Sequence, residues 1–192
     1  MKEKLTLRNL LVCCAVLFGL LVFIFSFITS VKGYDGGGNY TGSYKNVVWG
    51  CSSFVMPNGT EMKAAKPYDA CVLQVIGAIL VLVAAICAGV LAFAGEKLVK
   101  NEKVRKIVML VAGGMMVVGA VFAVLTPLSF FDVLAKEYAE QMHCTVEQAK
   151  EALKAGGGTL SAPMSIVSGI LALLGGGAVV ASQFVPDKKL VK

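Results

Sequence analysis

The sequence predicts an all-α membrane protein, a four-transmembrane-helix bundle, from its composition, its long apolar runs and the position of its basic residues. Of its 192 residues, 57% are hydrophobic and 16% are charged, and the mean hydropathy is +0.76. A soluble domain usually has about a quarter of its residues charged. This composition argues against a soluble enzyme, a disordered chain and a nucleic-acid-binding domain.

Four runs of the sequence are long enough to cross a bilayer. A helix needs about 20 mostly apolar residues to span a hydrocarbon core about 30 Å thick. Four runs satisfy this and contain no Asp, Glu, Lys, Arg or His: 9–31, 71–94, 107–125 and 164–185. We therefore treat residues 1–192 as a single integral membrane domain. It has outer loops at 32–70 and 126–163 and a cytoplasmic loop at 95–106.

The first run has a second interpretation, as a signal peptide. Lys2, Lys4 and Arg8 precede it, as basic residues precede the apolar core of a signal. That core is about 7–15 residues long, whereas the run at 9–31 is longer, which favours an uncleaved anchor.

The basic residues set the expected orientation. They are denser in residues 1–8, 95–106 and 186–192 than in the two outer loops. The positive-inside rule places such segments in the cytoplasm, so we expect both termini inside and the chain in a cell membrane. The net charge of +6 is then an orientation signal. Contact with anionic lipid headgroups is a secondary expectation, and nucleic acid is not an expected partner.

Small residues in the last three runs suggest close helix packing. Small side chains let helices approach each other in lipid, where the hydrophobic effect does not drive them together. The candidate packing positions are Gly89, Gly113, Gly114, Gly119, Gly169 and Gly176. Alternatively, Gly is simply common in membrane helices. The first run is richer in Leu, Val and Phe, so we expect it to present more surface to lipid or to a partner.

The first outer loop is predicted to form a small β hairpin or sheet. Residues 46–55 are rich in β-branched and aromatic types, and Asn58–Gly59 is a turn signal. Trp49 is the expected anchor of this loop. Asn39 and Asn58 begin glycosylation sequons. Cys13 and Cys14, near the cytoplasmic end of the first run, are candidate palmitoylation sites or simply small apolar residues.

Three cysteines fall in or beside the outer loops. A bridge between Cys51 and Cys71 would close about twenty residues and contribute about 3 kcal/mol. Cys144 provides two alternative pairings, with Cys51 or with Cys71, and fully reduced thiols are a further alternative.

The second outer loop is predicted to contain short helices. Pro127 ends the third run, and apolar residues then recur at helical spacing through residues 131–142. Thr145 and Gln148 have capping-box spacing and begin a second short helix, which Gly156–Gly158 stops and joins by a hinge to the fourth run. The apolar stripe of the first helix covers the protein itself or, alternatively, binds a partner.

No pattern in the sequence indicates a catalytic, cofactor or metal site. His143 is the sole histidine, and its neighbour Cys144 would point about 100° away on a helix, which favours a surface histidine beside a structural cysteine over a ligand or nucleophile pair. The absence of ionisable residues from the four runs argues against a transporter of charged substrates. A pore lined by backbone or apolar groups in an oligomer needs no ionisable residues, so this absence does not argue against it.

Trp49-Gly50-Cys51, followed by Cys71 in a longer first outer loop, resembles the motif of the claudin and peripheral-myelin-protein superfamily. Val48 stands where that family has Leu, and one residue rather than two separates Trp49 from the first cysteine. The resemblance implies a four-helix bundle that assembles laterally and makes protein contacts through its outer loops. We therefore expect a non-enzymatic protein that associates with other membrane proteins or with itself. The alternatives are a small channel or accessory subunit of a transport complex and, third, a membrane enzyme using His143 or Cys144.

Overall fold

The computed structural model describes residues 6–51, 53–64 and 66–185. The expected cytoplasmic termini, with their lysines, lie outside these residues. The chain forms two compact units. We call Met1–Ile24, Ile76–Val121 and Ser168–Lys192 the helical unit, and Phe25–Val75 and Phe122–Val167 the sheet unit.

Four helices are long and apolar enough to cross a membrane, which confirms the helices predicted from the four runs. They are α1 (Leu7–Ile28), α2 (Val72–Leu98), α3 (Glu102–Val124) and α6 (Pro163–Ala181). Helix α3 begins before its apolar run because Asn101 caps it, its side-chain oxygen accepting the backbone N–H of Lys103 at 3.0 Å. That these helices lie in a bilayer remains a prediction, since it rests on length and composition.

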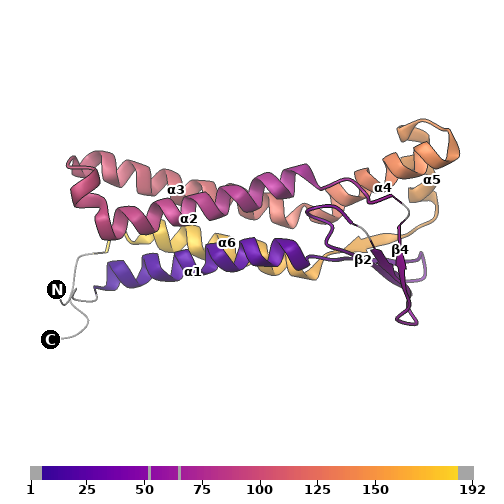
Figure 1. Ribbon diagram of the computed structural model, residues 1–192, viewed down its shortest axis with the longest axis horizontal. Helices are drawn as coiled ribbons and strands as arrows, with labels where there is room; N and C mark the ends of the chain where they lie inside the picture. Colours follow the sequence, from indigo (N-terminus) through magenta and orange to yellow (C-terminus); the bar gives the residue numbers. More distant parts are fainter. Residues whose placement is uncertain (1–5, 52, 65, 186–192) are drawn as a thin grey trace. The chain divides into compact units, whose positions relative to one another are not determined.

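In the helical unit, α1, α2, α3 and α6 lie side by side (Figure 1). All four contribute to one buried apolar core, which consists of Val12, Ala15, Val22, Val81, Ala84, Ala85, Ala88, Met109, Ala112, Met116, Ala120, Ala172 and Val179. Many of these side chains are Ala and Val, so the helix backbones approach closely. Glycines also lie at the helix contacts.

Glycines make the α3–α6 contact. A Cβ atom added at Gly113 would lie 3.0 Å from the carbonyl oxygen of Gly176, and one at Gly176 would lie 2.7 Å from that of Gly113. Gly119 on α3 similarly faces the Gly77 carbonyl of α2, at 2.8 Å. Any larger residue would force these helices apart.

The other candidate packing glycines are placed differently. A Cβ at Gly89 would lie 3.0 Å from Val16 Cγ2 of α1, and Gly169 is buried. Gly114, in contrast, faces open space, with nothing within 4 Å of its added Cβ.

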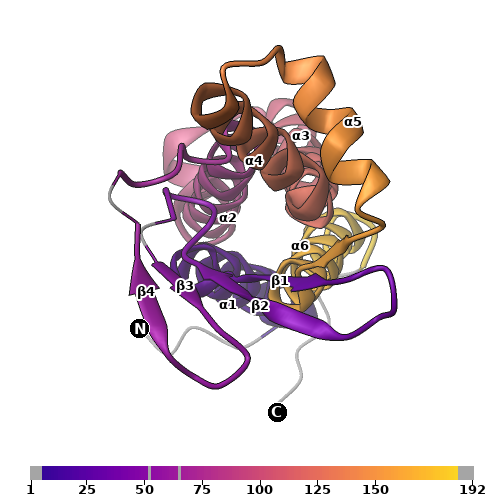
Figure 2. The same ribbon diagram turned by 90° about the vertical axis from the view of Figure 1, so that its right-hand side faces the viewer.

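The sheet unit contains a five-stranded antiparallel sheet with strand order β4-β3-β2-β1-β5 (Figure 2). The strands are β1 (Val31–Tyr34), β2 (Tyr40–Lys45), β3 (Ser53–Val55), β4 (Glu61–Lys63) and β5 (Thr159–Ser161). The small sheet predicted for the connection between α1 and α2 is thus confirmed, since β1 to β4 lie in it. The β character expected throughout residues 46–55 is wrong in part, because only Ser53–Val55 is a strand. Val47 and Val48 lie in a turn and are buried in the core.

Strand β5 was not predicted. Only a hinge was expected after Gly156–Gly158, yet residues 159–161 pair with β1 in the register Lys32↔Ser161, Gly33↔Leu160 and Tyr34↔Thr159. One sheet is therefore built from both long connections of the chain.

Two helices complete the sheet unit: α4 (Thr126–Met142) and α5 (Val146–Ala155). The capping box predicted at α5 is confirmed, since Thr145 Oγ1 accepts the Gln148 N–H while the Gln148 side chain accepts the Thr145 N–H. The two helices pack through Ala135, Ala139 and Ala149 and are joined by an ion pair of 2.8 Å between Lys150 Nζ and Asp132 Oδ1.

Candidate association surface

Trp49 anchors the turn between β2 and β3 to the last residues of α1. Its indole N–H donates a hydrogen bond of 2.8 Å to Ser26 Oγ, and its ring stacks on Phe27, with ring centroids 4.9 Å apart and planes 5° from parallel. The Val47 N–H also donates to the Thr29 carbonyl, at 3.1 Å. The anchor role expected of Trp49 thus has a specific geometry, and Ser26 is a partner that sequence analysis missed.

The predicted disulfide is not supported. All six cysteines are free thiols in this structure, including Cys51, Cys71 and the alternative partner Cys144. Cys51 and Cys71 are both buried in the core of the sheet unit, where they pack as small apolar side chains. Burial raises the pKa of the Cys51 thiol, whose Sγ donates to the Ser53 carbonyl at 3.2 Å.

Backbone hydrogen bonds join the segments that the disulfide was expected to join. The Tyr68 N–H donates to the Cys51 carbonyl at 2.7 Å, and the Cys71 N–H donates to the Val48 carbonyl at 3.1 Å. The spacing of Cys51 and Cys71 and their expected extracellular location suggested a disulfide. In this structure, backbone hydrogen bonds and apolar burial hold the two segments together instead.

Gln74 and Thr126 stabilise the break between α3 and α4. Pro127 has no N–H to donate to the Ala123 carbonyl, and the Thr126 hydroxyl donates to that carbonyl instead, at 2.6 Å. Gln74 Nε2 donates to the Phe122 carbonyl and to Ser129 Oγ, both at 3.0 Å. Both carbonyls at the end of α3 therefore have a side-chain donor where α4 begins.

Aromatic rings fill the space beneath the sheet. The Tyr44 ring lies 4.8 Å from that of Phe54, 5.0 Å from Phe130 and 5.8 Å from Tyr68, measured between centroids. Burial raises the pKa of Tyr44 to about 12. Phe130, which contacts Tyr44 and Tyr68, is fully buried. These contacts hold α4 against the sheet.

An apolar pocket of about 330 Å³ adjoins the aromatic cluster. Phe131 and Leu134 of α4 line it, together with Tyr34, Tyr44 and Phe54 of the strands, and none of its described lining residues is charged. The apolar stripe of α4 therefore mainly covers the sheet unit itself. Met142, at the end of the stripe, is exposed.

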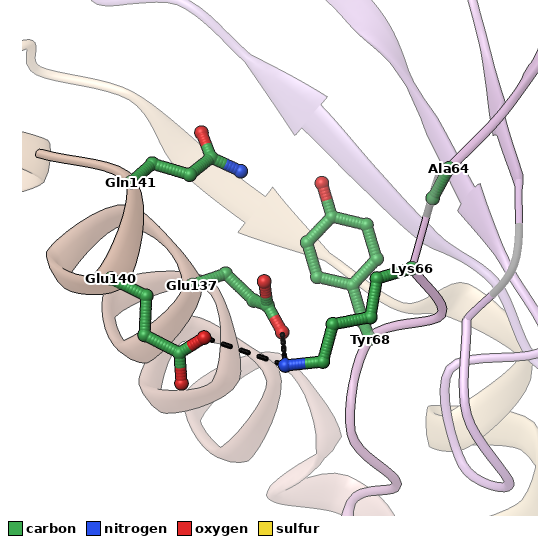
Figure 3. Close-up of a pocket in the computed structure, with 6 residues that line it drawn as sticks. All are labelled: Ala64, Lys66, Tyr68, Glu137, Glu140 and Gln141. Atoms are coloured by element: carbon green, nitrogen blue, oxygen red, sulfur yellow. Dashed lines mark hydrogen bonds and ion pairs between the residues drawn. The ribbon is translucent and has the colours of Figure 1, made fainter.

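A second, polar pocket of about 430 Å³ contains the Lys66 ion pairs (Figure 3). Lys66 Nζ lies 3.4 Å from Glu140 Oε2 and 3.9 Å from Glu137 Oε1, with Tyr68 beside it. Hydrogen bonding and attraction to Glu140 raise the pKa of Lys66, and Glu137 adds to the effect. The two carboxylates hold Lys66 in its charged ammonium form, so Lys66 is not a candidate general base.

The two edges of the sheet are β4 and β5. All three residues of β4, Glu61, Met62 and Lys63, are exposed. Glu61 pairs across the sheet with Lys45, at 3.1 Å between Nζ and Oε2, and a hydrogen bond with Ser53 followed by this ion pair lowers the pKa of Glu61. Edge strands present unpaired backbone groups to which another strand can add.

The remaining predicted residues lie apart from these features. His143 is exposed, ends α4 with a φ of 52°, and is followed by the half-buried Cys144. Asn39 and Asn58 both lie in exposed turns; the Asn39 side chain donates to Asp35, whereas Asn58 Oδ1 accepts the Thr60 N–H. Cys13 and Cys14 are half-buried on α1. Among the described residues no group of three His, Cys, Asp or Glu side chains could hold a metal ion.

Comparison with known proteins found no match, either to a protein-family model or to a curated protein. The function must therefore be argued from this geometry.

Proposed function

We propose that this chain is a non-enzymatic, four-pass membrane protein that assembles with copies of itself through the sheet unit. The proposal that the chain spans a membrane is supported by the exposed apolar surface of the four long helices. Large apolar side chains are exposed on each of them, including Leu17, Ile79, Ile86, Phe93, Ile107, Val111, Ile170 and Leu174. A soluble protein rarely exposes so large an apolar area, whereas lipid-facing helices must do so.

The positive-inside rule orients the proposed topology. Lys97 at the end of α2, Lys100 in the turn after it and Lys103 at the start of α3 are placed in the cytoplasm, as are both termini. The sheet unit is then extracellular in a cell membrane. This arrangement is also the basis for proposing a claudin-like role, because four apolar helices with a small sheet in the first long connection fit the resemblance of the Trp49-Gly50-Cys51 motif.

The exposed edge strand β4 supports association with a second copy. Its sequence, Glu61-Met62-Lys63, is self-complementary in charge. If two β4 strands pair antiparallel about Met62, Glu61 of one copy lies opposite Lys63 of the other, and opposite charges at facing positions stabilise a strand pair. The backbone groups of both edges would be satisfied by the same contact.

The membrane part is tested by extraction and by labelling from each side. We expect the chain to resist alkaline carbonate extraction from native membranes. Cysteines introduced as Asn58→Cys and Asn101→Cys should react with a membrane-impermeant maleimide from opposite faces. Labelling of both from the same face would contradict the four-pass topology.

The association part is tested by cross-linking at the edge. Met62→Cys should give a cross-linked dimer with a short bismaleimide in native membranes, because facing residues of a strand pair have Cβ atoms about 5 Å apart. Tyr40→Cys is the matched control, since Tyr40 is also exposed but lies on β2, an interior strand. Equal dimer yields from the two variants would contradict pairing through β4.

Charge exchange separates the proposed pairing from a general effect of mutation. Glu61→Lys alone places Lys opposite Lys63 of the second copy, so dimer yield should fall. The double change Glu61→Lys with Lys63→Glu restores opposite charges between copies, although it does not restore the contact of residue 61 with Lys45 within one chain. Recovery of the dimer by the double variant would support the proposal, and failure to recover would overturn it.

A further inference from the structure

One end of the helical unit gathers the start of α1, the turn between α2 and α3, and the residues after α6. Arg8 Nη2 donates to Gln183 Oε1 at 3.5 Å, and Lys106 Nζ lies 4.9 Å from the centroid of the Phe184 ring. The Arg105 side chain packs against Gly95, where an added Cβ would lie 2.8 Å from Arg105 Cδ. The Arg105 contact joins the two helices on either side of the α2–α3 turn.

Three exposed lysines cluster where α2 ends and α3 begins. Lys97, Lys100 and Lys103 follow each other at three-residue intervals and are exposed. In the part of the chain that the structure describes, none of the three makes an ion pair. The sheet unit has lysines of both kinds. Lys45, Lys66 and Lys150 each neutralise a carboxylate of the same chain, whereas Lys32, Lys136 and Lys154 are exposed and make no ion pair with a described residue.

Exposed apolar side chains lie among Lys97, Lys100 and Lys103. Leu98, the last residue of α2, is 62% exposed, and Ile107, four residues after Lys103 on α3, is 59% exposed. Unpaired ammonium groups beside exposed apolar groups match the boundary between lipid headgroups and acyl chains. There, lysine stems lie along hydrocarbon while their charges reach the phosphate level. A soluble acidic partner would have no use for Leu98 and Ile107.

We propose that Lys97, Lys100 and Lys103 form a binding surface for the headgroups of anionic phospholipids in the adjacent leaflet. The proposal rests on the membrane topology proposed above. Each ammonium donates hydrogen bonds to phosphate oxygens and meets the net negative charge that a zwitterionic lipid lacks. The chain should therefore select anionic lipid over phosphatidylcholine.

The test measures which lipid remains bound to the purified chain. The full-length protein is equilibrated in detergent micelles with equal amounts of phosphatidylglycerol and phosphatidylcholine of the same acyl chains. It is then repurified, and its bound lipids are counted by mass spectrometry. We expect enrichment of phosphatidylglycerol by about fivefold or more, the factor that one lysine near an anionic surface can supply. The enrichment should fall at high salt because exposed charges are screened.

Matched triple variants isolate the surface. K97Q/K100Q/K103Q should bring the enrichment close to one. K32Q/K136Q/K154Q removes the same charge from three exposed lysines of the sheet unit and should keep it. The charge-preserving variant K97R/K100R/K103R should also keep the enrichment, which excludes loss through misfolding. Equal loss in the two Gln variants, or no enrichment in the wild type, would overturn the proposal.

Carbonate extraction of the same chains distinguishes this failure from failure of the proposed function. A chain that stays in the membrane but shows no headgroup preference contradicts only the lipid surface. A chain that is extracted contradicts the topology, and the lipid surface with it.

Discussion

The helical unit and the sheet unit are stabilised in different ways. The helical unit packs Gly, Ala and Val so that its backbones touch, as Gly113 and Gly176 do. The sheet unit packs large aromatic rings around Phe130 and adds ion pairs and side-chain hydrogen bonds. The contrast is the one expected of a chain that folds in two solvents. In lipid, stability comes from close contact, whereas in water it comes from burying large apolar groups.

The two units also treat charge differently. In the sheet unit Lys45, Lys66 and Lys150 pair with carboxylates of the same chain, whereas Lys97, Lys100 and Lys103 cluster at one end of the helical unit and make no ion pair with a described residue. A lysine that is paired with a carboxylate of its own chain is already neutralised, whereas an unpaired lysine can bind an external anion. The comparison therefore separates a unit packed by aromatic rings and ion pairs from a unit packed by small residues, and the following substitutions test it from the largest effect to the smallest.

Phe130→Ala should destabilise the sheet unit by about 3–5 kcal/mol, because the ring is fully buried and its removal leaves a cavity. The chain has one tryptophan, Trp49, and it lies in the sheet unit, so its fluorescence during denaturation reports on that unit. Phe93→Ala is the control, since Phe93 is 51% exposed on α2. Equal shifts of the unfolding midpoint followed by Trp49 fluorescence in the two variants would contradict this prediction.

Gly113→Leu should destabilise the helical unit by about 1–3 kcal/mol, because any side chain there meets the Gly176 backbone. Its neighbour Gly114 faces open space, so Gly114→Leu should have little effect. Loss of helical circular dichroism on heating in detergent measures both. Similar melting temperatures for the two variants would mean that close backbone contact does not hold these helices together.

Tyr44 should make the stability of the sheet unit fall at high pH. The fold raises the pKa of Tyr44 to about 12, from an ordinary value of 10.0, because burial disfavours the phenolate. Below pH 10 the ring is neutral in both states and stability does not change through this group. Between pH 10 and 12 the unfolded chain ionises first, so about 2 kcal/mol is lost by pH 12.

The measurement is the difference between wild type and Tyr44→Phe across this pH range. Phe cannot ionise, so its unfolding midpoint should change less than that of the wild type from pH 10 to pH 12. Other groups that titrate there affect both proteins and cancel in the difference. Parallel curves would show that the Tyr44 hydroxyl is not withdrawn from water.

The features that local sequence determines were predictable. Four apolar runs gave four helices, Pro127 separated α3 from α4, and Thr145 with Gln148 formed the capping box. Each depends on residues within a few positions of one another. The apolar spacing of residues 131–142 likewise indicated α4, although not that Phe131 and Leu134 would line a pocket with the strands.

The features that depend on distant partners were not predictable. Strand β5 is three residues long and exists because it pairs with β1, more than a hundred residues earlier. Gln74 was visible as a polar residue in an apolar run, but its partners Phe122 and Ser129 belong to another helix pair. Val47 has high β propensity, yet burial against the sheet unit core places it in a turn.

The smallest effect we predict concerns the Trp49 anchor, whose hydrogen bond to Ser26 should contribute about 1 kcal/mol. Trp49→Phe removes the indole N–H but leaves a ring to stack on Phe27, and Ser26→Ala removes the acceptor. A double-mutant cycle followed by circular dichroism should give a coupling energy of about 1 kcal/mol. Thr60→Ala, in an exposed turn, provides the control and should combine additively with Trp49→Phe. If the Ser26 cycle is also additive, Trp49 anchors the turn through its stacking on Phe27 and not through this hydrogen bond.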